Sequence, residues 1–217
     1  MISNYKNLEL AVREAIIQWI NKEQNLSQEM LNSPGMTLSD LKKWLGYWML
    51  ARANPVIYRD QLLTQINEFL KPNILSIPDD EIPENIYPLA KELKNRGGTK
   101  NIQTSLVSKF AFCLRPELIV PIDSKAKEGL GRRYGNKIEN HNYLSYYEAF
   151  LLFKDETSTE LERSGLLEKL NHYWEPHMSK NLLLARVADK LLMLEGGFSV
   201  ELMEKSVNKH FGEHWKE

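Results

Sequence analysis

Apolar residues recur at helical spacing along most of the chain, and no stretch shows the two-residue alternation that is typical of β-strands. The predicted helices span residues 7–24, 37–48, 55–70, 86–95, 101–114, 143–153, 157–174, 181–194 and 200–210. In the first of them, every third or fourth position is apolar, from Leu8 to Ile20. The pattern predicts an all-α fold of about nine helices.

Proline and glycine mark the connections between these helices. Lys71-Pro72 is predicted to end the third helix, and four prolines with an acidic triplet make residues 72–88 a loop or a boundary. Residues 129–142, rich in Gly, Asn and basic residues, are predicted to form a loop. We interpret residues 1–217 as one domain that can be divided into two lobes, residues 1–78 and residues 79–217.

The most distinctive stretch is residues 99–130. Its helix, residues 101–114, is apolar on nearly all sides, so we expect it to be buried in the middle of a domain. Lys109 is the one charge within its apolar run, and Arg115-Pro116 ends the helix. After a short apolar segment, Asp123 or Ser124 can cap a further helix that begins near Lys125.

Gly97-Gly98-Thr99-Lys100, then the buried helix, then Pro121-Ile122-Asp123 follow one another in an order that resembles the helix-hairpin-helix DNA glycosylases. The 8-oxoguanine glycosylases are among the members of that family that the chain resembles. The resemblance covers residues 96–130 and implies a two-lobed all-α fold with a cleft between the lobes. It also implies that Asp123 assists departure of the base from the sugar.

In the bifunctional members of the family a lysine at the start of the buried helix attacks the sugar. At the corresponding position this chain has Thr104, and the nearest lysines are Lys100 and Lys109. Either is a candidate nucleophile, and water is the nucleophile in a monofunctional enzyme. An amine nucleophile must be partly deprotonated, which burial favours, whereas a lysine on the core can also extend its ammonium to water.

Charge is unevenly distributed along the chain. The net charge is −1, but residues 94–137 hold ten basic and three acidic residues, so this segment carries +7 and the rest −8. A local positive field suits a polyanion such as DNA, although clustered charges also occur on solvated surfaces. The candidate phosphate contacts are the hairpin-like glycines and the basic loop: Gly97, Gly98, Lys125, Lys127, Arg132, Arg133 and Lys137.

Aromatic side chains could hold a base that has been extruded from a duplex. Tyr143, Tyr146 and Tyr147 are the candidates for such a base pocket, because their polar tips favour partial exposure. The alternative is that they are core residues, which is the usual role of aromatic residues at helical spacing.

The remaining composition narrows the classes of function. With 42% hydrophobic and 26% charged residues, the chain is typical of soluble globular proteins. Its single cysteine, the absence of a membrane-length apolar run and the lack of a signal peptide predict a cytoplasmic protein outside the membrane. The histidines form no metal-binding pattern, and we expect neither metal nor cofactor.

Three hypotheses follow for the function. The first is a DNA glycosylase that excises an oxidised purine, with DNA as the partner. The second is a non-catalytic member of the same fold that binds nucleic acid or protein, for example in a defence or mobile-element system. The third is an all-α interaction module in which the resemblance is coincidental.

Overall fold

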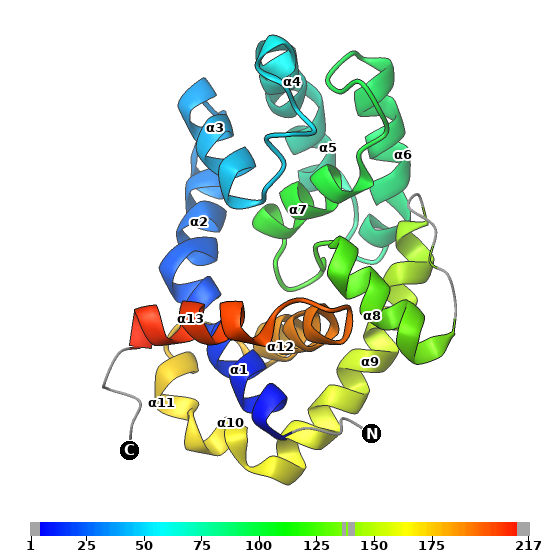
Figure 1. The fold of residues 1–217 in the computed structure, drawn as a ribbon. Helices are drawn as coiled ribbons and strands as arrows, with labels where there is room; N and C mark the ends of the chain where they lie inside the picture. The colour runs from blue at the N-terminus through cyan, green and yellow to red at the C-terminus, as the bar shows by residue number, and fades with distance from the viewer. Residues whose placement is uncertain (1–4, 136–137, 139–141, 212–217) are drawn as a thin grey trace. The chain divides into compact units, whose positions relative to one another are not determined.

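The structure is a computed structural model and describes residues 5–135, 138 and 142–211 (Figure 1). In these ranges every regular element is helical, which confirms the all-α prediction. The chain forms two compact units: unit 1 is Met1–Gln24, Asp123–Ile138 and Ser145–Glu217, and unit 2 is Asn25–Ile122 and Glu139–Leu144. These bounds differ from the single boundary predicted at residue 78, because the first helix of the chain packs with the last ones.

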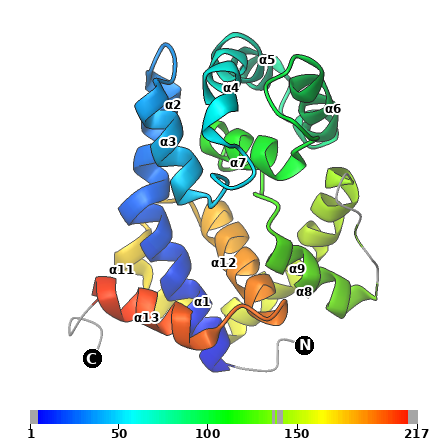
Figure 2. The same cartoon turned by 45° about the horizontal axis from the view of Figure 1, so that its top comes forward.

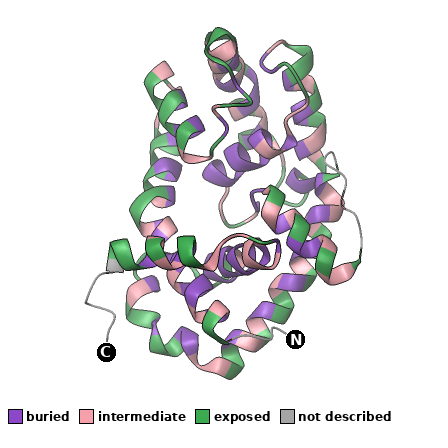
Figure 3. Ribbon diagram, viewed as in Figure 1, coloured by how far each residue is buried: buried purple, intermediate pink, exposed green. Residues whose placement is uncertain are grey.

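Unit 2 is built around α7 (Thr104–Leu114), which is buried at every position except Ser105. The burial is visible in Figure 3, in which most of α7 has the colour of buried residues. α7 packs against α5 and α6, and Trp44 of α3 meets Phe110 edge-on with ring centroids 5.7 Å apart. The other elements of this unit are α2 (Gln24–Asn32), α3 (Leu38–Tyr47), η2 (Val56–Tyr58), α4 (Arg59–Gln65), η3 (Ile66–Leu70), α5 (Lys71–Ser76) and α6 (Ile82–Asn95).

Unit 1 is built around α12 (Lys180–Glu195), which packs against α8 (Ser124–Tyr134) and α1 (Tyr5–Gln18), as Figure 2 shows. α1 also contacts α13 (Val200–Phe211) through a small apolar cluster that contains Ile17 and Met203. The other elements are η1 (Trp19–Glu23), α9 (Tyr143–Ser164, its first two residues in unit 2), α10 (Leu166–Lys169) and α11 (Asn171–Trp174).

Glycines allow α8 and α12 to meet backbone to backbone. A Cβ atom at Gly129 would overlap the carbonyl of Leu192, and one at Gly196 would overlap the carbonyl of Lys125. This contact explains why the loop predicted at residues 129–142 is wrong in its first part. Residues 129–134 continue α8, because burial against α12 outweighs the low helix propensity of glycine.

Two other helix boundaries differ from the prediction. The helix predicted to end at Lys71-Pro72 continues to Ser76, after the π-helical turn η3. In that turn the Lys71 amide donates to the carbonyl of Ile66, five residues back, so the bonding register shifts just before the proline that lacks an N–H. α9 runs unbroken until Gly165, whose φ of 68° ends it.

A buried ion network joins α1 to α12 within unit 1. The π-helical turn η1 carries Glu23, whose Oε1 accepts from Arg186 Nη2 at 2.5 Å. Arg186 Nη1 donates to Asp189 Oδ2 at 3.0 Å, and Lys190 Nζ lies 3.4 Å from the same oxygen. All four side chains are at most 9% exposed, and their formal charges cancel.

None of the helices within the described ranges combines the length and the apolar content that crossing a bilayer requires.

Candidate functional site

The segment that leads to Asp123 is attached to α7 through both backbone groups of Ile122. The Ile122 amide donates to Ser108 Oγ at 3.0 Å, and Ser105 Oγ donates to the Ile122 carbonyl at 3.0 Å. The two serines are three residues apart, so they lie on the same side of the helix. The Ile122 peptide is therefore held on α7 by two side-chain hydrogen bonds.

Asp123 is the N-cap of α8, and Ser124, the other cap candidate from the sequence, is the first residue of the helix. Its backbone is extended, with φ −116° and ψ 149°, and its Oδ1 accepts the amide of Lys125 at 2.8 Å. The side chain is half-buried. Its carboxylate lies at the N-terminal end of α8, where the helix dipole is positive.

Lys109 and Lys100 have different surroundings, although both belong to unit 2. Lys109 is 6% exposed, and its ammonium nitrogen lies 5.8 Å from the ring centroid of Trp48. A buried ammonium requires polar or aromatic partners, and an aromatic face is one of them. Lys100 is exposed, in the turn between α6 and α7. Asp123 belongs to unit 1.

The glycine pair forms the C-terminal cap of α6. Gly97, with φ 77°, donates its amide to the carbonyl of Lys94 at 2.9 Å, and Gly98 donates to Leu93 at 2.9 Å. This pair of bonds is a Schellman motif. A Cβ on Gly97 would overlap the Gln61 side chain, so the turn packs against α4 rather than standing free.

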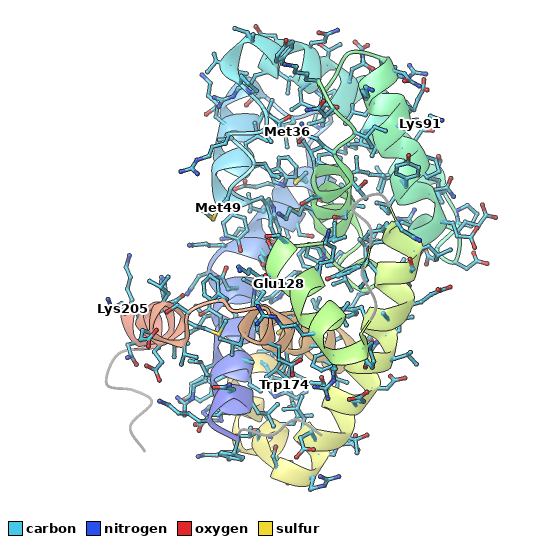
Figure 4. The ribbon with its side chains drawn as sticks, turned by 45° about the vertical axis from the view of Figure 1, so that its right-hand side comes forward. Met36, Met49, Lys91, Glu128, Trp174 and Lys205 are labelled. Atoms are coloured by element: carbon cyan, nitrogen blue, oxygen red, sulfur yellow. The ribbon has the colours of Figure 1, made fainter. Side chains whose placement is uncertain are left out.

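The basic residues of α8 are largely matched by carboxylates of the same unit. Lys125 and Arg132 both donate to Glu128, at 3.1 and 2.5 Å (Figure 4 labels Glu128). Arg133 bridges Glu156 at 2.7 Å and Glu195 at 2.9 Å. A further candidate, Lys127, is half-buried, and Lys137 lies outside the described residues.

The pair Arg133–Glu156 is part of a partly buried cluster on α8, α9 and α12. Burial opposes ionisation of Arg133, but its bond to Glu156 and the charge of Glu195 outweigh it, so the pKa of Arg133 is raised. Burial also raises the pKa of Glu195. Burial and the hydrogen bond to Glu156 raise the pKa of Tyr134 to about 12. At neutral pH the cluster therefore holds the arginine as a cation and the tyrosine as a neutral donor.

The three tyrosines differ in exposure. Tyr143 is 1% exposed, and its hydroxyl donates to the carbonyl of Val120 at 2.7 Å, while the amide of Val120 approaches the same oxygen at 3.3 Å. Tyr146 is fully buried beside Phe150. Tyr147 is half-buried, and burial raises its pKa. Only Tyr147 of these three presents a partly accessible ring in the structure.

The pattern of apolar residues drew attention to Lys109 but not to the groups around it. Ser105 and Ser108 attach the Ile122 peptide, and Trp48 covers the lysine. Two serine hydroxyls one turn apart on a helix expected to be buried could have predicted this attachment, because buried polar groups require hydrogen-bond partners. Within the described ranges, no group of three or more His, Cys, Asp and Glu side chains could hold a metal ion.

Comparison with protein-family models, with curated proteins and with solved structures gave no match for this chain.

Proposed function

We propose that the chain is a DNA-binding protein that cleaves the N-glycosidic bond of a damaged base, with an oxidised purine as the substrate class. The observation that carries this proposal is the half-buried Asp123 carboxylate at the start of α8, where its Oδ1 accepts the amide of Lys125. The resemblance of residues 96–130 to the glycosylase family supports the same reading.

The chemistry assigned to Asp123 is electrostatic. When the bond between the base and the sugar breaks, its electron pair leaves with the base and positive charge develops at C1′. A half-buried carboxylate stabilises that charge more strongly than one in bulk water. Water then adds to C1′, or a lysine amine adds and forms a Schiff base after opening of the sugar. Lys109 and Lys100 both remain candidates for the second route.

The test uses duplexes that contain 8-oxoguanine, uracil or an abasic site. Asp123→Asn is the informative variant, because asparagine caps a helix about as well as aspartate but carries no charge. Asp155→Asn, at an exposed position of α9, is the matched control. We expect base release by the wild type and the control and a loss of at least about a hundredfold in Asp123→Asn.

Borohydride trapping then identifies a lysine nucleophile. A trapped adduct that disappears in Lys109→Gln or in Lys100→Gln, but persists in the exposed control Lys94→Gln, assigns the nucleophile. Base release without any adduct assigns the monofunctional route. Absence of both base release and adducts with all three duplexes would refute the catalytic proposal.

A non-catalytic binding module of the same fold is the second candidate. The pairing of α8 arginines with Glu128, Glu156 and Glu195 favours it, because these carboxylates compensate much of the positive charge that would attract DNA. Binding of undamaged duplex that weakens steeply as salt rises, with no base release, would support a nucleic-acid module. No binding at low salt would leave a protein partner.

A further inference from the structure

Unit 2 contains a pocket of about 230 Å³ whose floor is apolar. The floor includes Met30, Trp44 and Phe110, and the wall continues through Met36 and Ile66. This volume exceeds the roughly 150 Å³ that encloses a benzene molecule and is below the range of about 300–1,000 Å³ for drug-sized ligands. A single ring or a short branched chain fits it.

The wall of this pocket is built on the π-helical turn η3, which supplies Ile66 and Asn67. The Asn67 side chain accepts the amide of Met36 at 2.7 Å and donates to the Met36 carbonyl at 2.9 Å. The connection between α2 and α3 that holds Met36 (labelled in Figure 4) is thereby fixed to η3. Single π turns inside α-helices occur frequently at functional sites.

Lys71 follows the π turn and lines the pocket. Its Nζ donates to the carbonyl of Ser33 at 2.5 Å, and among the described residues it forms no ion pair. Burial lowers its pKa. Within the described ranges, two of the three ammonium N–H groups therefore have no protein acceptor, and no carboxylate lies within ion-pair distance of the lysine.

The other charged groups at the pocket already have partners. Asp40 accepts from both the amide and the hydroxyl of Thr37, at 2.9 and 2.6 Å. Lys43 forms an exposed ion pair with Glu29 at 3.2 Å. The charges of these three side chains and Lys71 sum to zero, so a monoanion would be bound by Lys71 specifically rather than by an excess of positive charge.

We propose that this pocket binds a small carboxylic acid with an apolar body, whose carboxylate pairs with Lys71 and whose ring or branched chain lies on the methionine and aromatic floor. Methionine side chains adapt to such groups, and their sulfur atoms make favourable contacts with rings. The site belongs to unit 2 alone and is independent of the chemistry assigned to Asp123.

Methyl resonances of the methionines test this site in the intact chain, with phenylacetate as the probe. Met30 and Met36 line the pocket, whereas Met178 and Met203 belong to unit 1 and serve as internal controls. Assignment uses Met30→Leu and Met36→Leu. We expect saturable shifts of the two pocket methyls and unchanged control methyls.

The isosteric neutral probe phenylacetamide isolates the charge without any mutation. It should bind about tenfold more weakly or worse, because it cannot form a charge-assisted hydrogen bond. Lys71→Gln should weaken phenylacetate to a similar extent, while the exposed control Lys42→Gln should leave the affinity unchanged. Native-like dispersion of the Met30 and Met36 methyl resonances in the absence of probe shows that unit 2 is folded in each lysine variant.

Three results would overturn the proposal. The first is unmoved Met30 and Met36 methyls at saturating probe concentrations in the millimolar range. The second is equal affinity for phenylacetate and phenylacetamide. The third is an unchanged phenylacetate affinity in folded Lys71→Gln.

Discussion

Replacing Arg186 by methionine should destabilise unit 1 strongly, because the guanidinium is the central cation of the buried ion network. Its side chain is 2% exposed, and it joins Glu23, at 1%, to Asp189, at 4%. Methionine fills a similar volume without charge. The variant therefore retains two buried carboxylates whose shared cation is gone.

The magnitude follows from the burial of the partners. Removing one member of a buried ion pair costs about 3–5 kcal/mol, mostly because the remaining charge stays away from water. Lys190, 3.4 Å from Asp189, still compensates that carboxylate, so the loss falls chiefly on Glu23. We expect a loss of about 3 kcal/mol or more in the free energy of unfolding.

Urea unfolding at neutral pH, followed by circular dichroism at the helical band, measures this loss. The matched control is Arg163→Met, because Arg163 forms an exposed ion pair with Glu160, with the arginine side chain 64% exposed. Exposed pairs contribute about 0–1 kcal/mol. The double variant Glu23→Gln with Arg186→Met should be more stable than Arg186→Met alone, since it removes the buried charge that the guanidinium compensated.

Two outcomes would refute this reasoning. If Arg186→Met lost no more stability than Arg163→Met, the network would contribute no more than an exposed pair. If Glu23→Gln lowered the free energy of unfolding by as much in the Arg186→Met variant as it does in the wild type, Glu23 and Arg186 would act independently.

Three further predictions concern backbone contacts and caps. Gly129→Ala should cost about 1–3 kcal/mol or more, because its Cβ would overlap the backbone of α12. Gly46→Ala is the matched control in the same urea unfolding, because Gly46 is also helical but an added Cβ there meets no neighbouring atom. Met49→Gly should stabilise by about 1 kcal/mol, because Met49 has φ 55° and is 88% exposed; a thermal melt that showed no gain would contradict this. Thr37→Ala should cost about 1 kcal/mol at neutral pH. Its hydroxyl and amide hold the pKa of Asp40 below its usual value, so this stabilisation is present above the unfolded pKa of about 4 and is lost as the pH falls through the lower folded pKa. Unfolding curves of the Thr37→Ala variant at several pH values would refute the assignment if its cost did not decrease at all in acid, where only the bond from the Asp40 amide to the Thr37 hydroxyl remains to be lost.

Local pattern was sufficient for the features that depend on neighbouring residues. The helix of residues 104–114 is buried because its sequence offers no polar face, and the sequence alone made that expectation firm. Asp123 could be named as a cap candidate, since capping involves only the next few residues. The glycine pair Gly97-Gly98 follows the predicted helix 86–95 and could be placed at its end for the same reason, and Gly97 has a positive φ.

The tertiary structure decided everything that depends on partners far apart in the chain. Arg133 meets Glu156 and Glu195, which lie 23 and 62 residues away, so carboxylates from distant helices neutralise part of the excess positive charge of this segment. Gly129 is helical because its backbone packs against α12. The sequence of residues 129–142 alone carries no information about that contact. Helical periodicity reports which face of a helix is apolar, but not which distant segment covers it, and that second fact set the unit boundaries and the surroundings of every candidate residue.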